Sequence, residues 1–125
     1  MTERKREGSV PLGTDGERRT ALYLEKKGYR IMRYNYRCRF GEIDLIAFDP
    51  TGEILCFVEV KTRSGVEYGR PCEAVTCRKR RHIRKTAFHF LVHHPVHFRT
   101  MRLDVAEVLC LDGRFYIRYL ENIPV

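Results

Sequence analysis

Apolar residues recur at helical spacing in two stretches of the chain, and these stretches predict two helices. The first begins at a T-x-x-E capping box formed by Thr14 and Glu17 and ends before Gly28, so we expect it over residues 15–27. The second is expected over residues 73–92, where the apolar positions share one helical face. These positions are Val75, Ile83, Ala87, Phe90 and Leu91.

Shorter stretches rich in β-branched and aromatic residues, each bounded by turn residues, predict five strands. They cover residues 29–36, 42–48, 54–62, 100–109 and 115–119. Asp49-Pro50-Thr51-Gly52 and Asp112-Gly113 are typical hairpin turns, and the glycines and proline of residues 64–72 indicate a loop. The order α-β-β-β-α-β-β predicts an α/β fold with a mixed central sheet flanked by helices.

Composition is that of one folded domain, which we expect over residues 13–125, preceded by a flexible basic tail over residues 1–12. The tail lacks the apolar segment of a secretory signal, which predicts a cytoplasmic location. Apolar runs are far shorter than the roughly 20 residues of a membrane-spanning helix, so no membrane partner is expected. The five cysteines contain no C-x-x-C pair and are expected to be reduced thiols.

Charge changes this picture by indicating a partner. The chain carries 24 Lys and Arg against 16 Asp and Glu, a formal net charge of +8. Such a balance favours polyanions through electrostatic attraction and counterion release, and nucleic acid is the first candidate.

Two charged side chains at the end of a buried-looking strand require an explanation. Alternation places Glu59 and Lys61 on one face of the third strand. The position of Asp44 depends on the hairpin register. A turn centred on Thr51-Gly52 places Asp44 opposite Glu59, a turn centred one residue earlier leaves it diagonal on the same side, and a bulged loop separates the two.

Two neighbouring carboxylates repel each other, and a divalent cation is their natural partner. Mg²⁺, or Mn²⁺ in its place, suits an oxygen-rich site with few protein ligands, and Lys61 could align a water or stabilise charge on a phosphate. The alternative is an ordinary salt bridge between Glu59 and Lys61, with Asp44 capping a turn. The apolar neighbours Val58 and Val60 favour the metal site.

The strings GEIDLIAFD (residues 41–49) and FVEVKTRS (residues 57–64) resemble the PD-(D/E)XK nuclease pattern. More closely, residues 13–108 resemble the YraN family of predicted bacterial endonucleases, distant relatives of archaeal Holliday junction resolvases. The resemblance implies a restriction-endonuclease-like fold. Ile43 stands where the wider superfamily has its eponymous proline, and residues 119–125 match the family poorly.

The same resemblance implies roles for individual residues. Asp44 and Glu59 would be metal ligands, the Val60 carbonyl a third ligand, and Lys61 the catalytic lysine. Glu17 matches a glutamate that supports the metal in resolvase-like proteins, but it is also the N3 residue of the capping box, and both readings stay open.

Cations gather in the second predicted helix and the loop before it, where they could bind phosphates beside the metal site or simply form a solvated face. They are Arg63, Arg70, Arg78, Lys79, Arg80, Arg81, Arg84 and Lys85. Tyr34, Tyr36 and Tyr68 are expected to pack rather than stack on bases. His89 and His93 lie one helical turn apart, but no cysteine or carboxylate completes a zinc site, so the histidines are expected to pack or face solvent.

These observations lead to one functional hypothesis and one rival. The hypothesis is a metal-dependent endonuclease acting on DNA, with branched DNA and a homodimer suggested by the likeness to resolvases. The rival is a non-catalytic nucleic-acid-binding protein that uses the same fold within a DNA-processing assembly.

Overall fold

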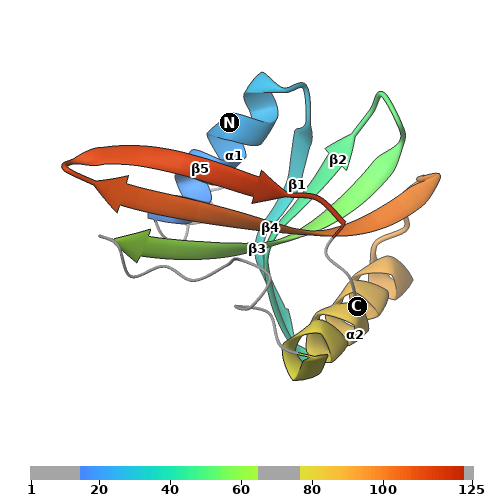
Figure 1. The fold of residues 1–125 in the computed structure, drawn as a ribbon. Helices are drawn as coiled ribbons and strands as arrows, with labels where there is room; N and C mark the ends of the chain where they lie inside the picture. Colours follow the sequence, from blue (N-terminus) through green and yellow to red (C-terminus); the bar gives the residue numbers. More distant parts are fainter. Residues whose placement is uncertain (1–14, 65–76, 123–125) are drawn as a thin grey trace, which may run out of the picture.

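A five-stranded mixed sheet with a helix on each face forms the protein in a computed structural model that describes residues 15–64 and 77–122 (Figure 1). The elements are α1 (Asp15–Lys26), β1 (Arg30–Cys38), β2 (Gly41–Asp49), β3 (Ile54–Ser64), α2 (Cys77–His93), β4 (Thr100–Leu111) and β5 (Arg114–Leu120). The strands lie in the order β1-β2-β3-β4-β5; β3 and β4 pair in parallel and the other neighbours are antiparallel. The predicted element order and mixed sheet are confirmed.

Local sequence explains where several elements end. Gly28 adopts a φ of 96° after α1, and the Tyr29 amide donates to the Leu24 carbonyl at 3.0 Å, as in a glycine-terminated Schellman motif. In the β2–β3 turn the Thr51 amide donates to the Asp49 carboxylate at 3.1 Å. Asp112 and Gly113 both have positive φ, which suits the tight turn between β4 and β5.

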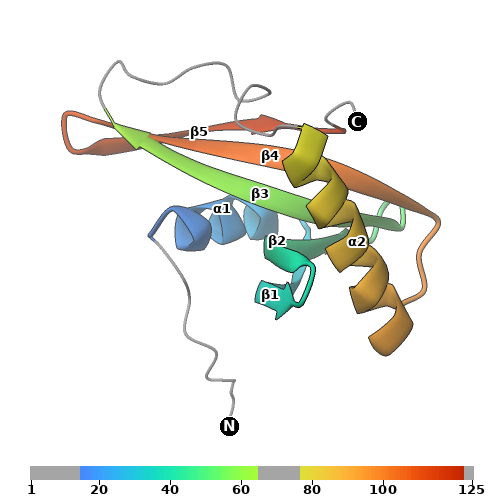
Figure 2. The ribbon, with the colours of Figure 1, turned by 90° about the horizontal axis from the view of Figure 1, so that it is seen from below.

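Two separate cores cover the two faces of the sheet, and β2 contributes to both by alternation. Ile46 and Phe48 belong to the core under α2, whereas Leu45 and Ala47 belong to the core under α1. Figure 2 shows α2 in front of the sheet and α1 behind it. The α2 core also contains three residues of the helix and two of the central strands: Ile83, Ala87, Phe90, Phe57 and Val105.

Some boundaries differ from the predicted ones, because pairing with a neighbour extends a strand beyond its apolar pattern. β1 continues to Cys38 opposite Gly41, and β3 continues to Ser64, where its parallel partner β4 still supplies hydrogen bonds. The expected tail (residues 1–12), Thr14, and residues 65–76 lie outside the described residues. Within the described part, neither helix is long and apolar enough to cross a membrane.

Candidate functional site

Asp44 and Glu59 lie where the pairing of β2 with β3 ends. The antiparallel register ends with Leu45 opposite Val58, and Asp44 and Glu59 are the next residues on the two strands. This is the register expected for a turn centred on Thr51-Gly52. Of the arrangements considered from the sequence, the structure has the one that brings the two carboxylates to adjacent strands at the same level.

The Asp44 side chain takes the place of a backbone acceptor at this point. Its Oδ2 accepts a hydrogen bond from the Val60 amide at 2.7 Å. Burial raises the pKa of Asp44, and the charge of Glu59 raises it further, to about 7, although the Val60 hydrogen bond opposes both effects. One backbone donor therefore does not compensate Asp44, and a cation placed between the two carboxylates would.

Glu59 faces α2, because it follows Phe57 on the same face of β3 and Phe57 packs in the α2 core. Its side chain is nearly buried, and two ammonium groups contact the same carboxylate oxygen. Nζ of Lys61 lies 3.4 Å from Oε2 of Glu59, and Nζ of Lys79 lies 2.7 Å from it. Glu59 thus has positive partners on its own strand and on the helix.

Lys79 is a member of this site, whereas the sequence suggested for it only a role in phosphate binding. Burial lowers its pKa, but the hydrogen bond and charge of Glu59 outweigh burial, so that the net shift is upward. The contact joins the first turn of α2 to β3. Sequence pattern carries no signal for it, because it depends on how α2 crosses the sheet.

Glu17 approaches the same region from the opposite face of the sheet. Gly16 lets the first turn of α1 lie against β3, since a Cβ there would meet Oγ1 of Thr62 at 2.1 Å. Glu17 is buried, and its Oε1 accepts a hydrogen bond from Asn35 at 2.9 Å. Its charge adds a smaller upward contribution to the pKa of Asp44. The capping partner Thr14 lies outside the described residues.

The oxygen donors of this site define what it could hold. Among residues 15–64 and 77–122, no three His, Cys, Asp or Glu side chains come together as a complete metal cluster. Asp44 and Glu59 supply two carboxylates, and the carbonyl of Val60, between Glu59 and Lys61 on β3, is a further backbone oxygen. Two carboxylates with remaining positions left to water or phosphate is the ligand set that Mg²⁺ commonly has in enzymes acting on phosphates.

The predicted phosphate-binding cations divide into two groups. Arg63 pairs with the neighbouring strand, because its Nε lies 3.8 Å from Oε2 of the buried Glu107 on β4. Oε1 of Glu107 accepts a 2.7 Å hydrogen bond from Arg118. Arg80 donates to Cys77 Sγ at 3.4 Å. The remaining described cations are exposed on α2, namely Arg78, Arg81, Arg84 and Lys85. Arg70 lies outside the described residues.

The histidines and tyrosines singled out from the sequence take part in packing. The Tyr36 hydroxyl lies 2.6 Å from Nδ1 of His89, and the His89 and His93 rings stack with centroids 4.1 Å apart. Tyr36 also packs edge-on against Phe90 in the core. Tyr34 is partly buried in the α1 core, and Tyr68 lies outside the described residues.

Comparisons with known proteins agree with the sequence resemblance at the level of the family. The model of "Uncharacterised protein family UPF0102" matches residues 16–108. A UPF0102 protein of Alkaliphilus metalliredigens is 45% identical over 114 residues, covering 91% of this chain and 97% of the relative. One from Chlorobaculum tepidum is 47% identical over 101 residues, covering 81% and 77%. The chain therefore belongs to the uncharacterised protein family UPF0102, the YraN family expected from its sequence.

Proposed function

We propose that this protein is a metal-dependent endonuclease that hydrolyses phosphodiester bonds in DNA, with the site arrangement of the PD-(D/E)XK nucleases that its sequence resembles. The observation that carries the proposal is that Asp44 and Glu59 follow the last paired residues of β2 and β3, close enough for the charge of Glu59 to raise the pKa of Asp44. Lys61 follows on the same face as Glu59, with its ammonium group 3.4 Å from the carboxylate. Acids and lysine have the order and spacing that this chemistry requires.

Asp44, Glu59 and the Val60 carbonyl would hold Mg²⁺ or Mn²⁺. When bound there, such an ion supplies Lewis-acid polarisation of the phosphate and lowers the pKa of an attacking water. The raised pKa of Asp44 supports this assignment, because a pair of like charges in a partly buried position favours a cation. Glu17 contributes negative charge behind this pair and keeps its Asn35 hydrogen bond.

The lysines supply positive charge next to the acids. Nζ of Lys61 and Nζ of Lys79 lie within 3.4 Å of the same Glu59 oxygen, so both can reach a phosphate that enters the site. Fixed ammonium groups stabilise the negative charge that develops on phosphate oxygens during hydrolysis, without the cost of reorganising solvent. Lys61 is the catalytic lysine of the proposal, and Lys79 is an additional phosphate-stabilising residue.

DNA is the proposed substrate, supported by the formal net charge of +8 and by the exposed cations of α2. Branched DNA and a homodimer follow from the likeness to resolvases, which act on junctions as dimers. Both belong to the proposal as analogies.

A second candidate is a non-catalytic nucleic-acid-binding protein, and one observation favours it. Glu59 already contacts two ammonium groups, which can compensate its charge without a metal ion. Asp44 separates the candidates, since burial and the charge of Glu59 raise its pKa to about 7 despite the hydrogen bond from the Val60 amide. A purely structural site has no need for an acid in this condition.

A cleavage assay with purified protein decides between the two functions. Single-stranded, duplex and branched DNA are incubated with Mg²⁺ or Mn²⁺, and with EDTA. We expect metal-dependent cutting that Glu59→Gln and Lys61→Ala each reduce by at least about a hundredfold, consistent with loss of one preorganised electrostatic group. The affinity of Lys61→Ala for DNA, measured in EDTA, should change far less than its rate of cutting.

The matched control is Glu25→Gln, which removes an exposed acid of α1 and should cut like the wild type. No cutting of any substrate, together with salt-dependent binding, supports the binding protein instead. Cutting by Glu59→Gln at the wild-type rate assigns the activity to another site or to a contaminant.

A further inference from the structure

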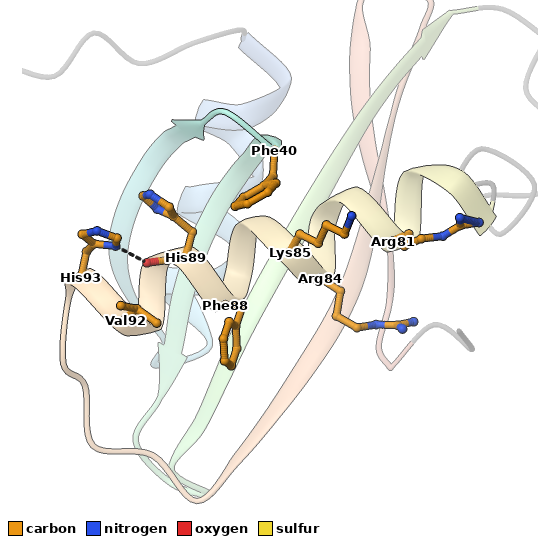
Figure 3. Close-up of a pocket in the computed structure, with 8 residues that line it drawn as sticks. All are labelled: Phe40, Arg81, Arg84, Lys85, Phe88, His89, Val92 and His93. Atoms are coloured by element: carbon orange, nitrogen blue, oxygen red, sulfur yellow. Dashed lines mark hydrogen bonds between the residues drawn. The ribbon is translucent and has the colours of Figure 1, made fainter.

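The solvent-facing side of α2 carries aromatic and cationic side chains around a shallow groove of about 580 Å³ (Figure 3). Figure 3 shows the lining along the helix, with Arg81 at one end and His93 at the other. We call it the α2 groove and define it by Phe40, Arg81, Arg84, Lys85, Phe88 and Val92. Phe40 comes from the turn between β1 and β2, and the other five come from α2.

Two large apolar side chains in the groove are mostly exposed to solvent. Phe88 is 70% exposed and Val92 is 62% exposed, while Ile83 and Phe90 on the opposite side of α2 are buried. Arg81, Lys85, Phe88 and Val92 follow one another at helical spacing and so form one stripe about 16 Å long at 1.5 Å per residue. Exposed apolar groups gathered in this way indicate a binding surface.

The charge of the groove identifies the kind of partner. α2 contains no Asp or Glu, and Arg81, Arg84 and Lys85 line the first half of the groove, before Phe88 and Val92. Nζ of Lys85 lies 6.0 Å from the centre of the Phe40 ring, so cation and aromatic face form one surface. A second copy docked through the same groove would bring these cations against their own counterparts, which opposes such a dimer. A polyanion with flat apolar groups fits both features.

An unpaired nucleic-acid strand has this chemistry. Its bases offer free ring faces for stacking on aromatic side chains, whereas bases in a duplex already stack on one another. Its phosphates match the cations, and the stripe is long enough to contact several successive nucleotides.

The groove runs along the helix that also contributes to the candidate site. Lys79, in the first turn of α2, contacts Glu59 on the sheet side, whereas Arg81 begins the groove on the solvent side of the same helix. We propose that the α2 groove binds an unpaired segment of DNA, with bases stacked on Phe40 and Phe88 and phosphates held by Arg81, Arg84 and Lys85. The choice of DNA rests on the proposed nuclease function, whereas binding of an unpaired strand requires no cutting.

Fluorescence anisotropy in EDTA measures this binding without cleavage. The probes are a labelled single-stranded oligothymidine, a base-free backbone of equal length and charge, and a duplex. Wild-type protein should bind oligothymidine more tightly than the base-free strand. Phe88→Ala should weaken oligothymidine binding by roughly five- to a hundredfold, the usual effect of losing one stacked base, and barely change the other two probes.

Leu22→Ala is the matched control. Leu22 is 53% exposed on α1, outside the groove, so its removal should leave all three affinities unchanged. Arg84→Ala should weaken binding of all three probes and lower its salt dependence, because it removes a phosphate contact without removing a stacking surface.

Several outcomes would overturn the proposal. Equal wild-type affinity for oligothymidine and the base-free strand would show that no base is stacked, and unchanged binding by Phe88→Ala would place it elsewhere. A dimer that Phe88→Ala converts to monomer, with DNA binding intact, would assign the groove to a second copy. Displacement of oligothymidine by polyglutamate at equal charge would assign it to acidic peptides.

These experiments test the nuclease proposal and the groove proposal independently of each other. If no metal supports cutting but the preference for oligothymidine persists and depends on Phe88, the nuclease proposal falls and the groove assignment stands. If Glu59→Gln abolishes cutting while Phe88→Ala changes no affinity, the site assignment stands and the groove assignment falls.

Discussion

Asp44 and Asp104 lie in the same sheet, but their carboxylates differ in the number of hydrogen-bond donors around them. Asp104, on β4, is fully buried and accepts hydrogen bonds from the Arg102 guanidinium, the Tyr119 hydroxyl and the Asn122 amide. Asp44, on β2, accepts one from the Val60 amide and stands opposite a second acid. The fold can therefore satisfy a buried acid with its own donors, and at Asp44 it does not.

The surroundings of Asp104 explain its role. Arg102 donates to the carboxylate at 3.0 Å and also to the Tyr29 hydroxyl at 2.7 Å, so the cluster connects β4 with the start of β1. Tyr119 and Asn122 add the end of β5 and the segment after it. Such a network stabilises tertiary structure and leaves no acceptor for a ligand. Asp44 keeps its unfavourable position because, in our account, a cation completes it.

Removal of Asp104 is expected to have the largest effect on stability. Asp104→Ala leaves the mostly buried Arg102 with only the exposed Glu121 carboxylate and leaves the Tyr119 hydroxyl without its acceptor, which should lower the free energy of unfolding by about 3–5 kcal/mol. Urea unfolding at neutral pH measures it, with Asp104→Asn as a milder variant that retains the shape. Glu25→Ala on the exposed face of α1 should stay within about 0.5 kcal/mol of wild type. A small loss in Asp104→Ala would remove the contrast with Asp44.

Asp44→Asn is expected to raise the free energy of unfolding, by an amount that depends on pH. The folded pKa of about 7 lies above the ordinary value of 3.8, so wild-type stability falls as pH rises between these values and Asp44 ionises in the fold. Asparagine avoids that loss and still accepts the Val60 hydrogen bond.

The stability advantage of Asp44→Asn should therefore grow from near zero at pH 3 to its full value at pH 8. We expect on the order of 2 kcal/mol, less than the shift alone implies, because Asp44 is only partly buried and solvent screens it. Denaturant unfolding in EDTA at both pH values measures the difference. An advantage that is independent of pH, or a loss of stability at pH 8, would show that Asp44 is compensated as Asp104 is.

Lys79→Ala should have the smallest effect. Lys79 is about two-fifths exposed and Lys61 remains on Glu59, so its loss should cost no more than about 1 kcal/mol. Thermal or urea unfolding gives the value. A loss as large as that of Asp104→Ala would make the Lys79–Glu59 contact a structural ion pair and would favour the non-catalytic function.

Much of this fold follows from local signals in the sequence. The T-x-x-E start and Gly28 stop located α1 to within one residue of its end. The turn residues Asp49 to Gly52 and Asp112-Gly113 located two hairpins correctly, although the register of the first was left open. Strand ends were predicted too short because their last residues are held by pairing with a neighbour rather than by apolar alternation. Ser64, for example, belongs to β3 through its parallel partner Cys110.

Only those parts of the site that depend on residues close together in the sequence could be predicted. Strand alternation placed Glu59 with Lys61, and the hairpin allowed Asp44 a small number of registers. Lys79 could not be placed from the sequence, because its contact with Glu59 requires α2 to pack Ile83, Ala87 and Phe90 on the sheet at one angle. The close approach of α1 at Gly16 likewise depends on a strand distant in sequence.

Titration of the protein with Mn²⁺ in a calorimeter tests the central claim most directly, namely that Asp44 and Glu59 form a cation site. We predict saturable binding by the wild type that Asp44→Asn and Glu59→Gln each abolish and that Glu25→Gln leaves unchanged. Absence of binding in the wild type, or equal binding by Asp44→Asn, would contradict the account.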